Sequence, residues 1–144
     1  LKTYPVRKLS SEKGGEYGAT TGRPRRCGWF DGVVLKHAAK VNGLTSLAIT
    51  KIDVLDELDS IDICTAYECE GKKITDFPSN LEKLEKCKPV YEELPGWKQK
   101  LSDIKNYKDL PKNAKKYVER IAEIAGAKVT LISTGAERGQ IVRI

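Results

Sequence analysis

The most informative absence in this 144-residue sequence is methionine, which does not occur at all. A chain that begins at Leu1 without any methionine is not typical of an initiating translation product, so we expect it to be part of a longer polypeptide. Histidine occurs once, as His37, within a stretch that reads as a helix, where packing is favoured over catalysis. No Gly-x-x-x-x-Gly-Lys-Ser/Thr string, the usual phosphate-cradling loop, is present.

Cysteine is also scarce, with four residues and no Cys-x-x-Cys pair: Cys27, Cys64, Cys69 and Cys87. Together with one histidine they make a poor zinc set and a poor disulfide framework, so we expect free buried thiols in a reducing compartment. Residues 1–5 have no apolar signal region, and the longest apolar runs are far shorter than a membrane span. These features favour a cytoplasmic location.

Positive charge is concentrated near one end of the sequence. The formal net charge is +6. The first 30 residues hold seven basic side chains and two acidic ones, so five of the six net charges lie there. A nucleic-acid-binding module usually spreads lysine and arginine over a whole face or helix. A field focused on one segment is better suited to a discrete anionic ligand.

The basic segment ends in residues 15–31, which hold four glycines, two adjacent threonines and three arginines but no apolar period of a helix or strand. This composition predicts an ordered loop. Glycine lets a backbone approach a ligand closely, hydroxyls and backbone N–H groups can hold an anion, and arginine matches carboxylate and phosphate oxygens. Trp29 and Phe30 argue against a purely solvated loop. The loop is therefore expected to bind an anionic small molecule or nucleic acid.

The remaining sequence alternates between expected helices and strands. Helices are expected after the N-cap Asp31, over residues 81–87, and between Pro111 and Gly126. Strands are expected at 46–50, 61–69, 89–97, 128–132 and 141–144, with a short return at 74–77 that makes a hairpin. Trp97 is expected to be a packing residue. We expect an α/β fold with a mainly parallel buried sheet flanked by helices and an added β-hairpin.

Two short motifs follow buried strands. Lys51-Ile52-Asp53 comes directly after residues 46–50, where open α/β sheets bind ligands. An aspartate there can accept hydrogen bonds from the two adjacent N–H donors of guanine, whereas adenine offers a different pattern, and the lysine stem can lie along the ring. Ser133-Thr134-Gly135 follows residues 128–132 and could contact a base or ribose, or be a plain turn.

The loop also resembles a known family. Gly18-Ala19-Thr20-Thr21-Gly22-Arg23, followed by Arg25-Arg26-Cys27-Gly28-Trp29-Phe30-Asp31, is similar to the aspartate- and inosinate-recognition loop of adenylosuccinate synthetase. The resemblance continues, in the family's order, through residues 42–45, 48–56, 91–97 and 132–135. It covers the C-terminal part of the family only, from about residue 15 to the end. Pro24 and Ala136 depart from the family's pattern.

The resemblance implies a ligase of purine biosynthesis that joins L-aspartate to inosinate at the expense of GTP, with Mg²⁺, in a cytoplasmic homodimer. It implies that residues 1–144 are the C-terminal portion of a larger P-loop-like nucleotide-binding domain. The aspartate and inosinate site would comprise Ala19, Thr20, Thr21, Gly22, Arg23, Pro24 and Arg25. The GTP site would comprise Arg25, Lys51, Ile52, Asp53, Ser133, Thr134 and Gly135. The family's phosphate loop, magnesium ligands, and catalytic aspartate and histidine have no counterpart in this sequence.

Two other function classes are compatible with parts of the sequence. A nucleic-acid-binding module would use Arg23, Arg25, Arg26 and Trp29 and would bind polynucleotides with a steep salt dependence. The near-neutral remainder of the chain argues against it. A non-catalytic guanine-nucleotide-binding protein would keep the role of Asp53 but would have no use for residues 20–23.

The isolated chain is expected to be catalytically inactive, because the phosphate loop and the catalytic aspartate and histidine are missing. We predict that the chain, mixed with GTP, inosinate and L-aspartate, releases no phosphate above the buffer rate in a colorimetric assay. Measurable GTP-dependent release by the isolated chain would contradict this expectation.

Overall fold

The computed structural model describes residues 12–144, so the expectations about residues 1–5 and about Lys2, Arg7 and Lys8 lie outside the described residues. The described chain is an α/β structure with seven strands, three α-helices and two short 3-10 helices. In order, the elements are β1 (Phe30–Asp31), α2 (Gly32–Asn42), β2 (Ser46–Ile49), η1 (Ile52–Leu55), β3 (Ser60–Cys69), β4 (Lys72–Ile74), α3 (Leu81–Lys86), β5 (Lys88–Pro95), η2 (Tyr107–Asp109), α4 (Lys112–Ala125), β6 (Lys128–Ser133) and β7 (Ile141–Arg143).

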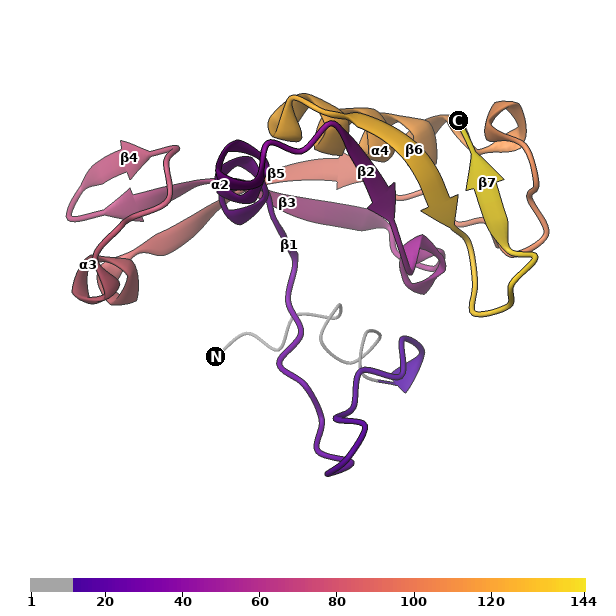
Figure 1. The fold of residues 1–144 in the computed structure, drawn as a ribbon, viewed down its shortest axis with the longest axis horizontal. Coiled ribbons are helices and arrows are strands. Elements are labelled where there is room, and N and C mark those ends of the chain that lie inside the picture. Colours follow the sequence, from indigo (N-terminus) through magenta and orange to yellow (C-terminus); the bar gives the residue numbers. More distant parts are fainter. Residues whose placement is uncertain (1–11) are drawn as a thin grey trace.

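The strands form two mixed sheets instead of one mainly parallel sheet. In the first, β3 pairs in parallel with the short β1 and antiparallel with both β4 and β5. In the second, β2 pairs in parallel with β6, and β6 pairs antiparallel with β7. Figure 1 shows the two sheets side by side, with α2 near their junction and α4 behind. The α/β class is thus confirmed, whereas the expected mainly parallel pairing is wrong.

The first sheet contains one tight antiparallel reversal and one longer one. The expected hairpin is confirmed between β3 and β4, with its turn at Glu70 and Gly71, both of which have positive φ. The strand return lies at Lys72–Ile74, slightly earlier than expected. The chain then crosses by α3 and comes back as β5, which pairs with β3 along nearly its whole length.

The hydrophobic core lies between the sheets and α4. Its largest fully buried side chains include Ile52, Ile61, Ile63, Leu101, Ile121 and Ile132. The expected helix after Pro111 is confirmed and buries Ala114, Tyr117, Val118 and Ile121 on one stripe. Trp97 is buried, as expected of a packing residue. His37 lies on α2 with its ring 5.2 Å from that of Phe77, which fits the packing role expected for it.

Asp31 joins the first helix to the first sheet. Its Oδ1 accepts hydrogen bonds from the backbone N–H groups of Val33 and Val34, both at 3.0 Å, so it caps α2 as expected. Its Oδ2 accepts a hydrogen bond of 2.5 Å from the Tyr67 hydroxyl on β3. Burial, followed by this contact with a carboxylate, raises the pKa of Tyr67 above its ordinary value, so the hydroxyl keeps its proton and remains a donor.

The expectation of free thiols is wrong for Cys69 and Cys87, which form a disulfide. Glu68 pairs with Lys88 in the antiparallel β3–β5 ladder, so the next residues outward face each other, with Cα atoms 4.5 Å apart. Cys27 and Cys64 are free. Burial raises the pKa of the Cys64 thiol to about 11, so this thiol stays protonated at neutral pH.

β1 and β2 are both edge strands within residues 12–144. β1 pairs only with β3, and β2 pairs only with β6.

No helix in this part of the chain is long and apolar enough to cross a membrane.

The Asp31 contacts predict a stability difference between two helix caps. Asp31→Ala removes a cap and leaves the Tyr67 hydroxyl without a partner, so we expect the free energy of unfolding to fall by about 3 kcal/mol. The control is Asn80→Ala, because Asn80 also accepts from two backbone N–H groups but has no third partner; about 1 kcal/mol is expected. Urea unfolding followed by circular dichroism measures both, and equal losses would contradict the account.

Candidate functional site

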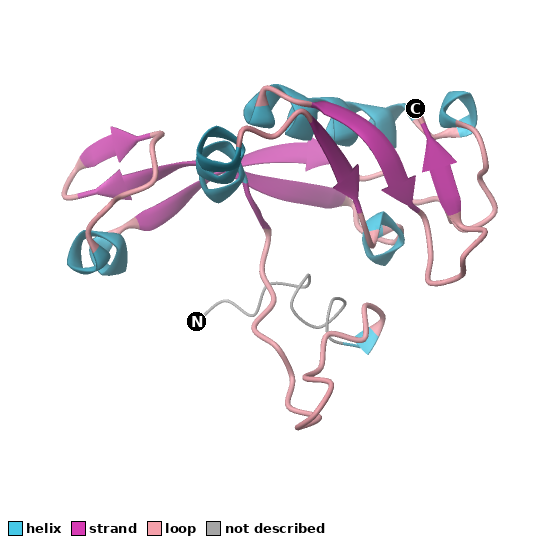
Figure 2. Ribbon diagram, viewed as in Figure 1, coloured by secondary structure: helices cyan, strands magenta, loops and turns pink. Residues whose placement is uncertain are grey.

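The arginine loop, defined here as residues 16–26, is an ordered hairpin-like loop on the surface. Its backbone closes on itself: Gly18 N–H donates to the Arg23 carbonyl, Gly22 N–H to that of Gly18, and Arg25 N–H to that of Glu16, each at 2.8 Å. Gly22 has a φ of 63°, a conformation that favours glycine. The expected order of this loop is therefore confirmed. Figure 2 shows it extending away from both sheets.

Most of the loop residues predicted to bind substrate are exposed. Ala19, Thr20, Thr21, Gly22, Arg23, Pro24 and Arg25 all belong to this exposed set. The Thr21 hydroxyl accepts a hydrogen bond of 3.4 Å from the backbone N–H of Arg23. The threonines, the arginine side chains and the free backbone groups of the tip thus face solvent, where a ligand could reach them.

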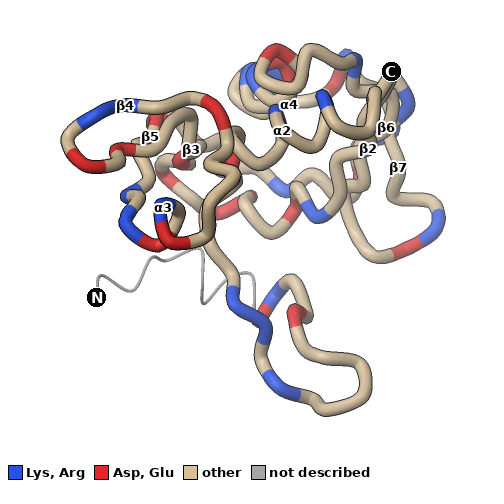
Figure 3. Tube along the Cα trace, turned by 60° about the vertical axis from the view of Figure 1, so that its left-hand side comes forward, with Lys and Arg blue, Asp and Glu red and all other residues tan. Residues whose placement is uncertain are grey.

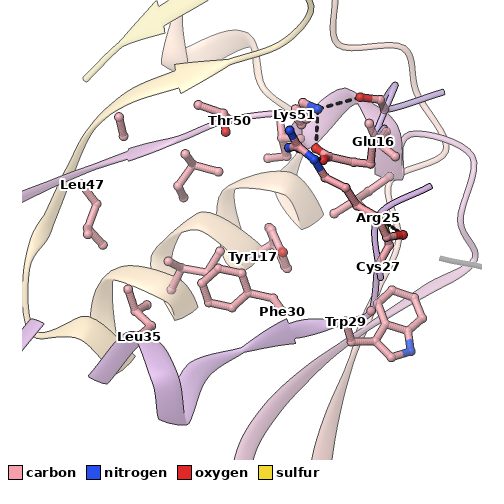
Figure 4. Close-up of a pocket in the computed structure, with 18 of the residues that line it drawn as sticks. Glu16, Arg25, Cys27, Trp29, Phe30, Leu35, Leu47, Thr50, Lys51 and Tyr117 are labelled. Carbon is pink, nitrogen blue, oxygen red and sulfur yellow. Dashed lines mark hydrogen bonds and ion pairs between the residues drawn. The ribbon is translucent and has the colours of Figure 1, made fainter. Parts of the chain in front are cut away.

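A cavity of about 540 Å³, called here the β2 cavity, lies between the root of the arginine loop and strand β2. One end is charged and is lined by Glu16, Arg25, Arg26 and Lys51. The other end is apolar and is lined by side chains from β1, α2, β2 and α4: Phe30, Leu35, Leu47, Ile49, Tyr117 and Ile121. Figure 4 shows the charged side chains gathered on one side and Phe30 and Tyr117 on the other.

Glu16 holds the charged end of the β2 cavity together. Lys51 Nζ forms an ion pair with the Glu16 carboxylate and donates a hydrogen bond of 2.6 Å to the Gly14 carbonyl. Arg25 Nη1 donates to Glu16 Oε2 at 3.1 Å (Figure 4). The hydrogen bond from Lys51, and then that from Arg25, hold the pKa of the Glu16 carboxyl below its ordinary value. The Glu16 side chain is 23% exposed, less than half the exposure of either partner.

Lys51 has an unusual backbone conformation. It has φ 59° and ψ 31°, the left-handed region, and it immediately precedes η1. This conformation costs a residue with a Cβ about 1–2 kcal/mol, and such costs are concentrated at functional sites. It ends β2 abruptly, so that the Lys51 side chain turns toward the arginine loop. Ile52, which sequence also placed in the GTP site, is buried in the core with 1% of its surface exposed.

Asp53 faces a different hollow from Lys51. A second cavity, of about 500 Å³ and called here the Asp53 cavity, is lined by Asp53, Asp56, Lys98, Lys100 and Ser102, among others. Asp56 is occupied structurally, since it accepts hydrogen bonds from Trp97 Nε1 at 2.8 Å and from the Leu101 N–H at 3.0 Å. Burial raises the pKa of Asp56. Within residues 12–144, no side chain or backbone N–H bonds to the Asp53 carboxylate, which leaves it available to a ligand.

Ser133, Thr134 and Gly135 lie beside the Lys51 turn. Both motifs follow the carboxyl ends of strands, as expected, and because β2 and β6 are parallel and Ile49 pairs with Ile132, these strand ends are neighbours. Ser133 Oγ donates to the Gly135 carbonyl at 2.8 Å, and the Thr134 N–H donates to the Gln140 carbonyl at 2.9 Å. Thr134 is fully buried, and its hydroxyl has no partner within the described residues.

The structure thus brings some predicted site residues together and separates others. Arg25 and Lys51 meet through Glu16, and the Ser133 segment lies next to the Lys51 turn. Lys51 and Asp53 open onto separate cavities. Glu16 was not among the site residues predicted from the sequence. The feature that points to it is that it is one of only two acidic residues in the basic first 30 residues.

No group of three histidine, cysteine, aspartate or glutamate side chains in residues 12–144 could hold a metal ion.

The chain is similar to adenylosuccinate synthetases throughout its length. The family model for adenylosuccinate synthetase matches residues 4–142. The chain is 52% identical over 131 residues to the adenylosuccinate synthetase of Trichlorobacter lovleyi and 53% identical over 129 residues to that of Staphylococcus aureus strain COL. These matches cover 91% and 90% of this chain but 30% of each relative, so the chain spans about a third of their length.

A solved structure supports the same relationship. The fully ligated adenylosuccinate synthetase of Plasmodium falciparum superposes with a TM-score of 0.92 at 34% identity, over 100% of this chain and 35% of that one. The arrangement of two sheets, three helices and the arginine loop is therefore that of one part of a larger enzyme.

The Glu16 contacts predict a measurable pKa. Because the folded-state pKa of Glu16 is lowered, its ion pairs are present at neutral pH and are lost as the pH falls through that lowered value. Carboxyl ¹³C NMR should give a midpoint for Glu16 below that of an unpaired glutamate, and Lys51→Gln should raise it. Lys98→Gln, which removes a lysine paired with Asp59 instead, should leave it unchanged. An ordinary Glu16 midpoint in the unmodified chain would show that the pairs do not form in solution.

Proposed function

The chain belongs to the adenylosuccinate synthetase family, and from this premise we propose that it is the C-terminal portion of an enzyme that joins L-aspartate to inosinate at the expense of GTP. In this reaction GTP phosphorylates the 6-oxygen of inosinate, and the aspartate amine then displaces the phosphate. The observation that carries the proposal is the meeting of Arg25 and Lys51 on one carboxylate, which brings an anion-binding loop to a base-recognition turn.

The arginine loop would bind the two smaller substrates. Ala19 to Arg25 present two hydroxyls, free backbone N–H groups and two guanidinium groups to solvent on a loop with an ordered backbone. Arg23 would contact inosinate and aspartate, and Arg25 would lie near aspartate and GTP. An arginine fork can bond both oxygens of a carboxylate or phosphate at once, which suits both kinds of ligand.

The Lys51 turn would bind the guanine of GTP. The unpaired Asp53 carboxylate would accept from the N1–H and the 2-amino group, the Lys51 stem would lie along the ring, and residues 133–135 would line the pocket. In this arrangement the base would have to reach across η1 from the Lys51 side to the Asp53 side, because the two side chains line separate cavities.

The rest of the enzyme would supply the phosphate loop, the magnesium ligands and the catalytic aspartate and histidine. The unpaired edges of β1 and β2, with the apolar end of the β2 cavity between them, support the proposal that this chain completes a larger P-loop-like nucleotide-binding domain. Additional strands along these edges would join the two mixed sheets. A cytoplasmic homodimer is proposed for the complete enzyme by family membership.

A nucleic-acid-binding function fits the structure less well. Figure 3 shows basic and acidic positions interspersed over both sheets, with the basic excess in the segment before β1. Within that segment Arg25 is already paired with Glu16. The basic surface is thus small and partly neutralised, whereas polynucleotide binding relies on many free cations along an extended face.

Nucleotide choice tests the proposal. The enzyme is completed by placing this chain in the position of the matching segment of the Staphylococcus aureus relative, and adenylosuccinate formation is followed by absorbance. We expect the completed enzyme to be active with GTP. Asp53→Asn should lower kcat/KM for GTP by about 100-fold or more, because a donor then faces the 2-amino group. It should raise activity with xanthosine triphosphate, whose 2-oxo group accepts from the new amide.

Asp59→Asn is the control, because Asp59 is an exposed aspartate that pairs with Lys98 and lines neither cavity. It should leave the choice between the two nucleotides unchanged. An inactive completed enzyme would contradict the proposed reaction. Equal behaviour of Asp53→Asn and Asp59→Asn would contradict the assigned guanine contact.

A further inference from the structure

The arginine loop is joined to the rest of the fold through very few polar contacts. Within residues 12–144, the hydrogen bonds and ion pairs that connect residues 12–27 to later parts of the chain involve two lysines only. Lys51 bonds to Gly14 and Glu16, and Lys13 pairs with Glu57. The Lys13–Glu57 pair has side chains 46% and 68% exposed, and such surface pairs contribute little.

Glu16 therefore has a special place at this junction. Its side chain receives Lys51 from the end of β2 and Arg25 from the far limb of the arginine loop. Its backbone carbonyl also accepts the Arg25 N–H at 2.8 Å, so Glu16 holds Arg25 through both backbone and side chain. One residue thus sets the position of a loop arginine relative to the turn that carries Lys51.

We propose that Glu16 is a positioning residue that fixes Lys51 and Arg25 relative to each other and so couples the guanine-binding turn to the aspartate-binding loop. The inference rests on the function proposed above and adds to it a residue that touches neither substrate. In this role Glu16 keeps the two binding elements at a fixed position relative to each other.

The physical reason lies in the flexibility of the two cations. Lysine and arginine both lose much rotamer freedom when they are fixed, and an unanchored side chain would lose this freedom on binding each substrate. Because Glu16 and Gly14 hold Lys51 Nζ, the aliphatic stem of Lys51 is already oriented before guanine binds. With Arg25 Nη1 held by Glu16, its remaining N–H groups have a fixed direction toward solvent. Loss of the carboxylate releases both side chains at once.

The test uses the completed enzyme and compares Glu16→Gln with a matched control. Glutamine keeps the shape of the side chain but cannot accept from both cations with two charged oxygens. We expect Glu16→Gln to raise KM for GTP and KM for L-aspartate together, each by about tenfold, as for the loss of a charge-assisted hydrogen bond. The kcat should stay within about threefold, because Glu16 does not touch the reacting atoms.

Asp76→Asn is the control, because Asp76 is also a single carboxylate shared by two lysines, Lys36 and Lys40, but it lies away from the loop. It should leave both KM values unchanged. The coupling is overturned if Glu16→Gln behaves like Asp76→Asn, if only one KM rises, or if kcat collapses while both KM values stay the same.

A second readout separates this inference from the proposed reaction. In amide NMR spectra of the 144-residue chain, Glu16→Gln should shift the signals of residues 16–26 and of Lys51 together, whereas Asp76→Asn should shift neither set. Absence of adenylosuccinate with these shifts present would count against the reaction alone. Unshifted Lys51 signals in Glu16→Gln would count against the coupling, whatever the enzyme does.

Discussion

The Asp31 carboxylate is the contact on which the arrangement of the molecule depends. After the arginine loop and residues 27–29, the chain makes two residues of strand in β1 and then turns directly into α2. Asp31 sits at that turn, with one oxygen on the first N–H groups of α2 and the other on Tyr67 of β3. Asp31 thereby ties the start of α2 to β3, and the packing of α2 against β3 and α4 completes its placement. The loop and the Lys51 turn consequently meet at the same end of the fold.

Local features were predictable because local chemistry determines them. Asp31 and Gly43 mark the limits of α2, and Pro111 and Gly126 those of α4, since caps depend on a few neighbouring residues. The strands after these helices are short and apolar and were found close to their expected bounds. Strand pairing could not be predicted in this way, because strand register and direction depend on contacts between distant segments. β3 therefore has a second antiparallel partner, β5, that was not expected, and Cys69 faces Cys87.

The candidate site also combines features that the sequence predicts with features that only the folded structure shows. The sequence indicates that the loop is ordered and that Lys51-Ile52-Asp53 and Ser133-Thr134-Gly135 each follow a strand. That these two strands are parallel neighbours is seen only in the structure. The sequence does not indicate that Ile52 is a core residue or that Lys51 and Asp53 face two cavities, because side-chain direction follows from the left-handed conformation of Lys51. Glu16 could not be identified from composition, since an acidic residue in a basic loop has many possible partners. The assignment of ligands to these residues stays a prediction.

In the proposed enzyme, one chain supplies both the substrate loop and the guanine-binding turn, and Glu16 fixes the position of one relative to the other. A crystal structure of the completed enzyme with GDP and L-aspartate bound would test it most directly. The account predicts that the guanine N1–H and 2-amino groups donate to Asp53, that aspartate lies against Arg23, and that Glu16 still contacts both Lys51 and Arg25. Guanine bound elsewhere, with Asp53 still facing solvent, would contradict it.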